Sequence, residues 1–136
     1  AAARIDMAVA ERIQEIPMLL ASSEMVAFDQ LASSPDEISN ADHSGIENRA
    51  LPIFLVALHS WLRNPAEPML VIGSCLSAGG AVEMTAAVGG ALAGSCIGEH
   101  RFPAVLKEGL LEGEEISAAA DLLYQSQVQE RRRRKL

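Results

Sequence analysis

Among the side chains of this chain that could do chemistry, Glu83 stands out by its position. It is the only charged residue between Pro68 and Gly98, and it follows the segment GGAV at 79–82. A carboxylate at this place could serve as an oxygen ligand. Alternatively, a negative charge in the first turn of a helix stabilises the positive end of the helix dipole. The second interpretation requires fewer assumptions, because no second carboxylate stands near Glu83 in the sequence.

The histidines and cysteines point to packing more than to chemistry. His59 has no histidine, cysteine or carboxylate three or four residues away, so we expect a hydrogen-bonded core or boundary residue. His100 lies in an expected loop. Cys75 and Cys96 stand in no metal-ligand spacing, and we interpret them as small buried side chains in a reducing compartment. This interpretation predicts a cytoplasmic protein.

The element that must position Glu83 is a helix of small residues, expected over 84–98. Ala86, Gly90, Gly94 and Gly98 recur every four residues and line one helical face, and Ala87, Ala91 and Ser95 fall beside them. Such a smooth face lets other backbones approach closely. We therefore predict a central buried helix that is entered through the Gly79–Gly80 turn.

The remaining chain has helical periodicity, interrupted by one long polar loop. Alanine-rich composition with only 4% aromatic residues favours helices over sheets. We predict an all-α fold of about six or seven helices, in a single domain over 1–130 followed by a basic tail over 131–136. The other helices are expected at 1–16 (ended by Pro17), 18–32, 49–63 and 66–76, then a short one ending at Gly113 and a last one starting at Glu114 with Ile116, Ala119, Ala120, Leu123 and Val128 inward.

Charge and hydropathy exclude two classes of function. Removing the five positive charges of Arg131–Lys135 from the formal net charge of −7 leaves −12 on the remainder. This negative charge on the residues before Arg131 argues against nucleic-acid binding by the folded part. The lone basic run is interpreted as a solvated tail. The apolar stretches on either side of Glu83 are about 15 residues each, shorter than the roughly 20 that span a bilayer, so we expect no membrane segment.

The polar loop at 33–48 has two interpretations. Pro35, Asn40 and Gly45 mark it as irregular, and loops of this length often carry function. The residues His43 to Glu47 could contact a ligand. Alternatively they form an exposed turn in which Gly45 supplies a positive φ.

Several segments, taken in order, resemble the ADP-ribosylglycohydrolase family. They are the Gly45–Ile46 loop, the helix led by Pro52, the Gly79–Gly80 turn, the helix AAVGGALAGS from Ala86 to Ser95, and the closing Pro103 helix. The resemblance covers roughly Glu37 to Tyr124, the C-terminal portion of a domain that normally runs about twice this length. It implies a helical fold, and hydrolysis of ADP-ribosyl bonds that depends on two magnesium ions.

The resemblance also implies where ligands bind. Relatives contact ADP-ribose through the loop that here contains Ser44, Gly45 and Ile46, and we add Gly79 and Gly80 as ligand-binding candidates. The family places Asp-Thr-Asp-Thr after the glycines, where this chain has Ala81, Val82, Glu83 and Met84. Glu83 is thus the one metal candidate left, and the family's N-terminal Thr-Asp-Asp motif has no counterpart.

Three functional hypotheses follow from this departure. The preferred one is a non-catalytic relative, either a degenerate product or half of a split domain, with no cofactor of its own. The second is a module that binds ADP-ribose, a nucleotide or an ADP-ribosylated protein without turnover. The third is a hydrolase completed by another chain. If half a domain is absent, an apolar surface should be exposed, so we also expect self-association or a partner chain.

Overall fold

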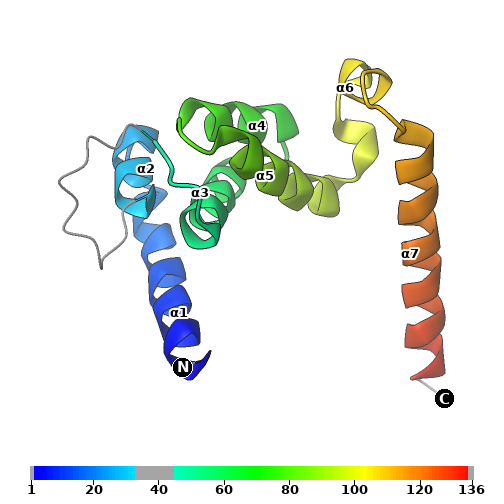
Figure 1. The fold of residues 1–136 in the computed structure, drawn as a ribbon, viewed down its shortest axis with the longest axis horizontal. Helices are drawn as coiled ribbons and strands as arrows, with labels where there is room; N and C mark the ends of the chain where they lie inside the picture. Colours follow the sequence, from blue (N-terminus) through cyan, green and yellow to red (C-terminus); the bar gives the residue numbers. More distant parts are fainter. Residues whose placement is uncertain (1, 33–44, 135–136) are drawn as a thin grey trace. The chain divides into compact units, whose positions relative to one another are not determined.

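Every regular element in the described residues, 2–32 and 45–134 of this computed structural model, is a helix (Figure 1). The confirmed all-α fold has one isolated parallel β-bridge between Ile46 and Gly80 in this part of the chain. The elements are α1 (Ala2–Leu19), α2 (Glu24–Ala32), α3 (Ala50–Arg63), α4 (Pro68–Ser77), α5 (Val82–Ile97), the 3-10 turn η1 (Glu99–Arg101), α6 (Ala104–Glu108) and α7 (Gly113–Arg133).

The chain divides into two compact units, residues 1–101 and 102–136, and each unit is described separately. The expectation of a single domain over 1–130 stays a prediction.

In the first unit α3 occupies the middle, because it packs against α1, α2, α4 and α5. Its apolar residues make this possible, since most of α3 is buried and little of its circumference is left polar.

The main hydrophobic core of the first unit lies between α1, α2 and α3. Its largest members come from all three helices and from the segment before α3: Ile16, Leu19, Phe28, Leu31, Ile46, Ile53, Leu55 and Val56. The burial of Ile46 anchors the segment before α3 in this core. Consequently the core also holds Gly45, the residue directly before Ile46, in place.

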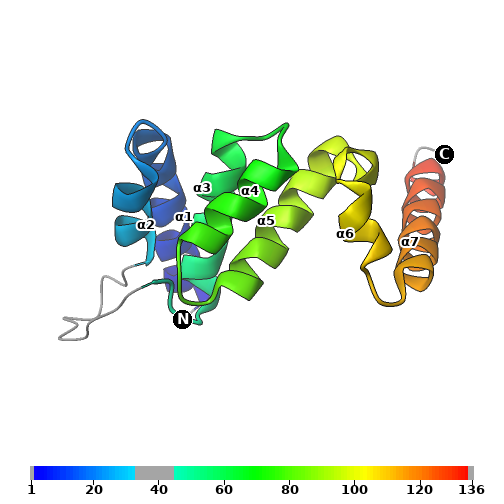
Figure 2. The same ribbon diagram turned by 90° about the horizontal axis from the view of Figure 1, so that it is seen from above.

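Helices α4 and α5 lie side by side in both views, joined by the short turn through Gly79 and Gly80 (Figure 2). The buried stripe of α5 is Thr85, Gly89 and Ala93. The predicted stripe of Ala86, Gly90 and Gly94 is displaced from it by one residue and is only half-buried. The reason is that α5 is small on several faces, so spacing alone could not identify the face that α3 and α4 cover.

The first helix continues further than its proline predicted. α1 includes Pro17 and ends at Leu19, whereas an end at residue 16 was expected. Proline inside a helix removes one N–H donor and crowds the carbonyl four residues earlier. Here it stands within the last turn, and Ile16 and Leu19 on either side of it are buried in the core. Packing thus outweighs the local penalty.

No helix in the described part of the chain is long and apolar enough to cross a membrane. The second unit contains α6 and α7. The stripe of α7 that was expected to face inward is exposed in the structure. Ile116, Ala119, Ala120 and Leu123 are all exposed, and only Val128 is half-buried. The prediction of an inward face was wrong, because periodicity shows which residues share a helical face but not whether that face is buried.

Candidate functional site

The two glycine loops singled out from the sequence are joined in the structure, although more than 30 residues separate them. The backbone N–H of Ile46 donates to the carbonyl oxygen of Gly79 at 3.1 Å, and the N–H of Ala81 donates to the carbonyl oxygen of Ile46 at 2.9 Å. These two bonds form the parallel bridge between Ile46 and Gly80. Four of the predicted ligand-binding residues are therefore neighbours at the start of α5.

Glycine is required at this junction for steric reasons. A Cβ atom on Gly45 would lie 2.3 Å from the backbone nitrogen of Gly80, and one on Gly80 would lie 2.2 Å from the carbonyl oxygen of Ile46. Both distances are far inside van der Waals contact. The φ angles of Gly45 and Gly80, +119° and +70°, also disfavour any other residue. The two loops touch backbone to backbone, and only glycine permits it.

The first turn of α5 presents backbone N–H groups beside this junction. Its N-cap residue, Ala81, has no side chain that could accept a hydrogen bond from the turn. The hydroxyl of the buried Thr85 donates to the carbonyl oxygen of Ala81 at 2.9 Å, and so it does not cap any N–H group of this turn. The N–H of Val82 already donates to the carbonyl oxygen of Gly80 at 2.8 Å. The next N–H groups of the first turn, those of Glu83 and Met84, have no intrahelical acceptors, so an anionic ligand could be bound there.

The metal candidate does not fit a magnesium pair. Glu83 is an exposed residue in the first turn of α5. Ala81 and Val82 offer only backbone oxygens, and the exposed Met84 offers a thioether that magnesium does not favour. Within the described residues no three His, Cys, Asp or Glu side chains gather in a way that could hold an ion. The negative charge of Glu83 instead complements the helix dipole of α5.

The other three members of the predicted loop have different outcomes. His43 and Ser44 lie outside the described residues. Glu47 is half-buried directly after the bridge, and its carboxylate lies 3.7 Å from the guanidinium of Arg49. This ion pair fixes the end of the loop just before α3 begins.

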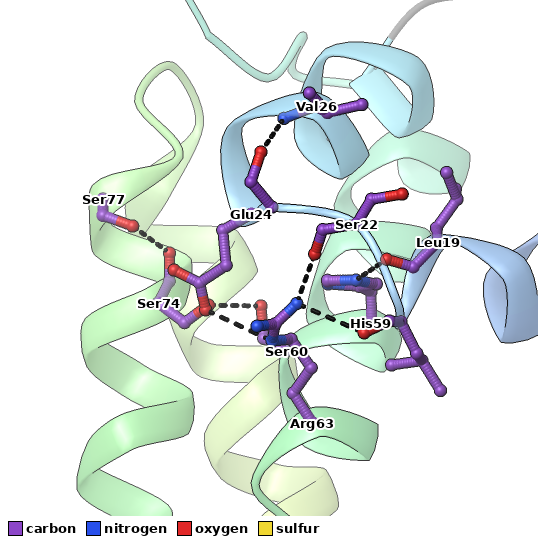
Figure 3. Close-up of polar contacts among 11 residues, drawn as sticks. Leu19, Ser22, Glu24, Val26, His59, Ser60, Arg63, Ser74 and Ser77 are labelled. Atoms are coloured by element: carbon purple, nitrogen blue, oxygen red, sulfur yellow. Dashed lines mark hydrogen bonds and ion pairs between the residues drawn. The ribbon is translucent and has the colours of Figure 1, made fainter.

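A second polar cluster, which sequence reasoning missed, lies between α2, α3 and α4 (Figure 3). The hydroxyl of Ser74 lies 2.9 Å from a carboxylate oxygen of Glu24, to which it donates, and 3.1 Å from the hydroxyl of Ser60. Both serines are buried. The signal that could have found them is a serine among the apolar residues of each of these helices.

Arg63 extends this cluster to the turn between α1 and α2. Its guanidinium donates to the carbonyl oxygens of Ser22 at 2.7 Å and Leu20 at 3.4 Å (Figure 3). The same group lies 4.0 Å from the Glu24 carboxylate. A cation is favourable at the carbonyl end of α1. The cluster therefore links α2, α3 and α4 to the turn after α1.

His59 is a core residue, as the sequence predicted. It is fully buried, and its Nε2 donates to the carbonyl oxygen of Leu19 at 3.3 Å, since a carbonyl can only accept. Phe28 packs against the ring edge to face, with the two ring centroids 5.7 Å apart. Burial lowers the pKa of His59 below its ordinary 6.5, more strongly than the bond to Leu19 raises it.

The two cysteines have different environments, although both were expected to be buried. Cys75 is buried between α4 and α5, and burial raises the pKa of its thiol. Cys96 is exposed near the end of α5. The expectation for Cys96 was wrong because the small residues around it allowed several faces of α5 to be the inner one.

A family model described as ADP-ribosylglycohydrolase matches residues 1–133. The match extends beyond the stretch from Glu37 to Tyr124 to which the sequence motifs pointed. The comparisons with curated proteins and with solved structures found no match.

Proposed function

This chain belongs to the ADP-ribosylglycohydrolase family, and we propose that it binds ADP-ribose at its joined glycine loops without hydrolysing it. The observation that carries the proposal is the bridge between Ile46 and Gly80. It brings together the two segments for which the family resemblance and the backbone geometry independently suggest ligand contact.

The chemistry of the junction suits a diphosphate. The two phosphates of ADP-ribose are anionic, and helix N-termini approached through glycine-rich turns bind such groups through backbone N–H donors. The first turn of α5 has this arrangement, with Gly80 before it and no side-chain cap at Ala81. The proposed site therefore relies on backbone groups and not on particular side chains.

Hydrolysis is not part of the proposal. Cleavage of an ADP-ribosyl bond in this family uses water activated by two metal ions, and metal activation of water requires ligands that hold the ions in place. Three of the four residues at the motif, Ala81, Val82 and Met84, have no side-chain oxygen. The proposal accordingly includes neither a magnesium ion nor any other cofactor of this chain.

The proposal is tested by isothermal titration of the purified chain with ADP-ribose. We expect saturable binding, and we expect Gly80→Ala to weaken it by about tenfold or more, because the added Cβ separates the two loops. Gly73→Ala is the matched control, since a Cβ there has nothing within 4 Å. Circular dichroism checks that both variants remain helical. Absence of binding to the unmodified chain would overturn the proposal.

A second variant separates binding from the split-hydrolase hypothesis. Glu83 places a negative charge in the same helical turn as the proposed diphosphate site. Glu83→Gln should therefore leave ADP-ribose affinity unchanged or improve it by up to about threefold, because it removes a like charge. A metal-dependent site would instead lose affinity or activity. Weaker binding by the Glu83→Gln variant would contradict the metal-free proposal.

The proposal extends to location and partners. The exposed free thiol of Cys96 supports a reducing compartment, and we propose the cytoplasm. An ADP-ribosylated protein is the natural macromolecular ligand of such a module. The acidic body supports the expectation that nucleic acid is not a partner.

A further inference from the structure

Two side chains of α3 hold the end of α1. His59 and Arg63 stand four residues apart, so they lie on the same face of α3. Nε2 of His59 donates to the carbonyl oxygen of Leu19 at 3.3 Å. One turn later, the guanidinium of Arg63 donates to the carbonyl oxygens of Leu20 and Ser22 (Figure 3). Carbonyl groups at the end of a helix have no donors within that helix, so α3 supplies donors that α1 lacks.

The ring of His59 is covered by α1 and α2. Leu19 of α1 accepts its hydrogen bond, and Phe28 of α2 packs on the ring edge to face. The ring is fully buried, and its Nδ1 has no hydrogen-bond partner within the described residues. Movement of α1 and α2 away from α3 would therefore expose the ring to water.

Burial makes the neutral ring the favoured form in this closed arrangement. A proton on Nδ1 would create a buried charged donor without an acceptor, which costs far more free energy than the neutral ring. In an open form, water accepts a hydrogen bond from the added proton and this cost is absent. The pKa of His59 is accordingly lowered below its ordinary 6.5 in the closed arrangement, chiefly by burial. Acid therefore favours the open form.

The neighbouring charges do not cancel the effect of burial. After burial, the hydrogen bond to Leu19 raises the pKa of His59, Arg63 lowers it and Glu24 of α2 raises it, and the net direction is downward. On α4, the buried thiol of Cys75 stays neutral because burial raises its pKa. The other ionisable side chains that the structure describes on α1, α2 and α5 are paired, as Arg12 is with Glu15, or exposed, as are Glu11, Asp29, Glu83 and Cys96.

We infer that His59 is an acid-sensitive latch, whose protonation releases α1 and α2 from α3 while α3, α4 and α5 stay packed. The release also separates the Glu24 carboxylate of α2 from the Ser74 hydroxyl of α4, which lie 2.9 Å apart in the closed arrangement. The inference does not depend on the proposed ADP-ribose site, and it is tested without ligand.

The opening can be confined to the first two helices because α3, α4 and α5 share a buried set of their own. Its members lie outside the core cluster that α3 forms with α1 and α2, and they are Ala57, Val71, Cys75 and Ala93. Contacts among these residues do not require α1 or α2. Segments with separate buried contacts can open at different free energies within one folded chain.

Amide hydrogen exchange of the full chain at pH 7.5 and 5.5, corrected for intrinsic exchange rates, tests the latch. At each pH, we expect the opening constant of α2 and the second half of α1 to exceed that of the most protected amides of α4 and α5 by about tenfold or more. Because the histidine of the open form has the ordinary pKa of 6.5, the opening constant of α1 and α2 should rise by up to about tenfold from pH 7.5 to pH 5.5.

Two variants separate His59 from other effects of acid. The side-chain amide of His59→Gln can still donate to Leu19 but does not titrate, so its opening constant should change by less than about twofold between the two pH values. His100→Gln, on the exposed η1 turn, is the matched control and should keep the rise of the unmodified chain. Each variant is compared with itself at the two pH values, which cancels any change in its overall stability.

Several outcomes would overturn the inference. One is an opening constant of α1 and α2 that does not rise in acid, and another is a rise of the same size in His59→Gln. Equal opening constants in α1, α2, α4 and α5 would mean that the whole unit unfolds at once. Nuclear magnetic resonance of the unmodified chain adds a test without any variant, because a His59 ring that is half protonated at or above pH 6.5 would remove the cause of the release.

Discussion

His59 has a polar side chain in the core of the first unit, and its two ring nitrogens are in different situations. Nε2 donates to Leu19, while Nδ1 is buried and has no hydrogen-bond partner. Burying a neutral imidazole nitrogen without a hydrogen bond costs less free energy than burying a charged ring, because the desolvation of an ion costs far more. The neutral ring is therefore the form that the fold accommodates.

This arrangement predicts a loss of stability at mildly acidic pH. The pKa of His59 is lowered in the folded chain, so as the pH falls below 6.5 the unfolded chain binds a proton first. The contribution of His59 is fully present above 6.5 and is lost as the pH falls toward the lowered pKa. Urea denaturation at pH 7.5, 6.5 and 5.5 measures this decline.

Two variants isolate the cause of the pH dependence. His59→Leu should lower stability at every pH but flatten the decline between pH 6.5 and 5.5. His100→Gln, on the exposed η1 turn, should leave the decline intact. A decline of the same size in His59→Leu would show that other groups cause it.

At the scale of elements, the contact between α4 and α5 depends on Gly89. A Cβ there would lie 2.8 Å from Sγ of Cys75 and 3.1 Å from a methyl carbon of Val71. The helices thus approach as closely as a glycine allows. The next glycine on α5 is not constrained in this way, since a Cβ on Gly90 would make ordinary contact with Ile72 at 3.9 Å.

The two glycines are predicted to respond oppositely to alanine. Gly90→Ala should raise the free energy of unfolding by about 0.5–1 kcal/mol, because alanine is the better helix former. Gly89→Ala gains the same propensity but must displace Cys75 and Val71, and we expect a net loss of about 1 kcal/mol. Chemical denaturation measures both, and equal stabilisation by both substitutions would refute the close packing of α4 on α5.

Sequence reasoning found most elements but not their buried faces. Periodicity, prolines and glycines located the α-helices of the described residues, because these are local signals, but not the 3-10 turn η1. The face of α5 and the exposure of the α7 stripe were predicted wrongly, because both depend on which other elements are present to cover them. The continuation of α1 through Pro17 depends in the same way on the burial of Ile16 and Leu19.

The candidate site was predictable in its residues but not in its geometry. Gly45 could be singled out by resemblance and by an expected positive φ, and Gly79–Gly80 by resemblance and as a Gly-Gly turn. Their direct backbone contact could not, because nothing local indicates a bridge between segments so distant in the chain. The Glu24, Ser60 and Ser74 cluster was missed for the same reason, since each residue alone is ordinary.

At the scale of the whole molecule, all buried apolar residues in the described chain lie before Arg101. We therefore predict that a fragment of residues 1–101 folds by itself, with a melting temperature within about 3 °C of the full chain. Thermal unfolding followed by circular dichroism measures the difference. A large loss of stability would instead support one cooperative domain over 1–130.

The central claim is that the joined glycine loops bind ADP-ribose without metal and without turnover. It is tested most directly by thermal unfolding of the chain with and without ADP-ribose. Both measurements are made in the presence and in the absence of magnesium. At about 100 times its dissociation constant a ligand adds about 2.7 kcal/mol, which raises the melting temperature of a domain of this size by several degrees. We predict the same rise in both samples, with intact ADP-ribose recovered afterwards. No rise, or a rise only with magnesium, would contradict the account.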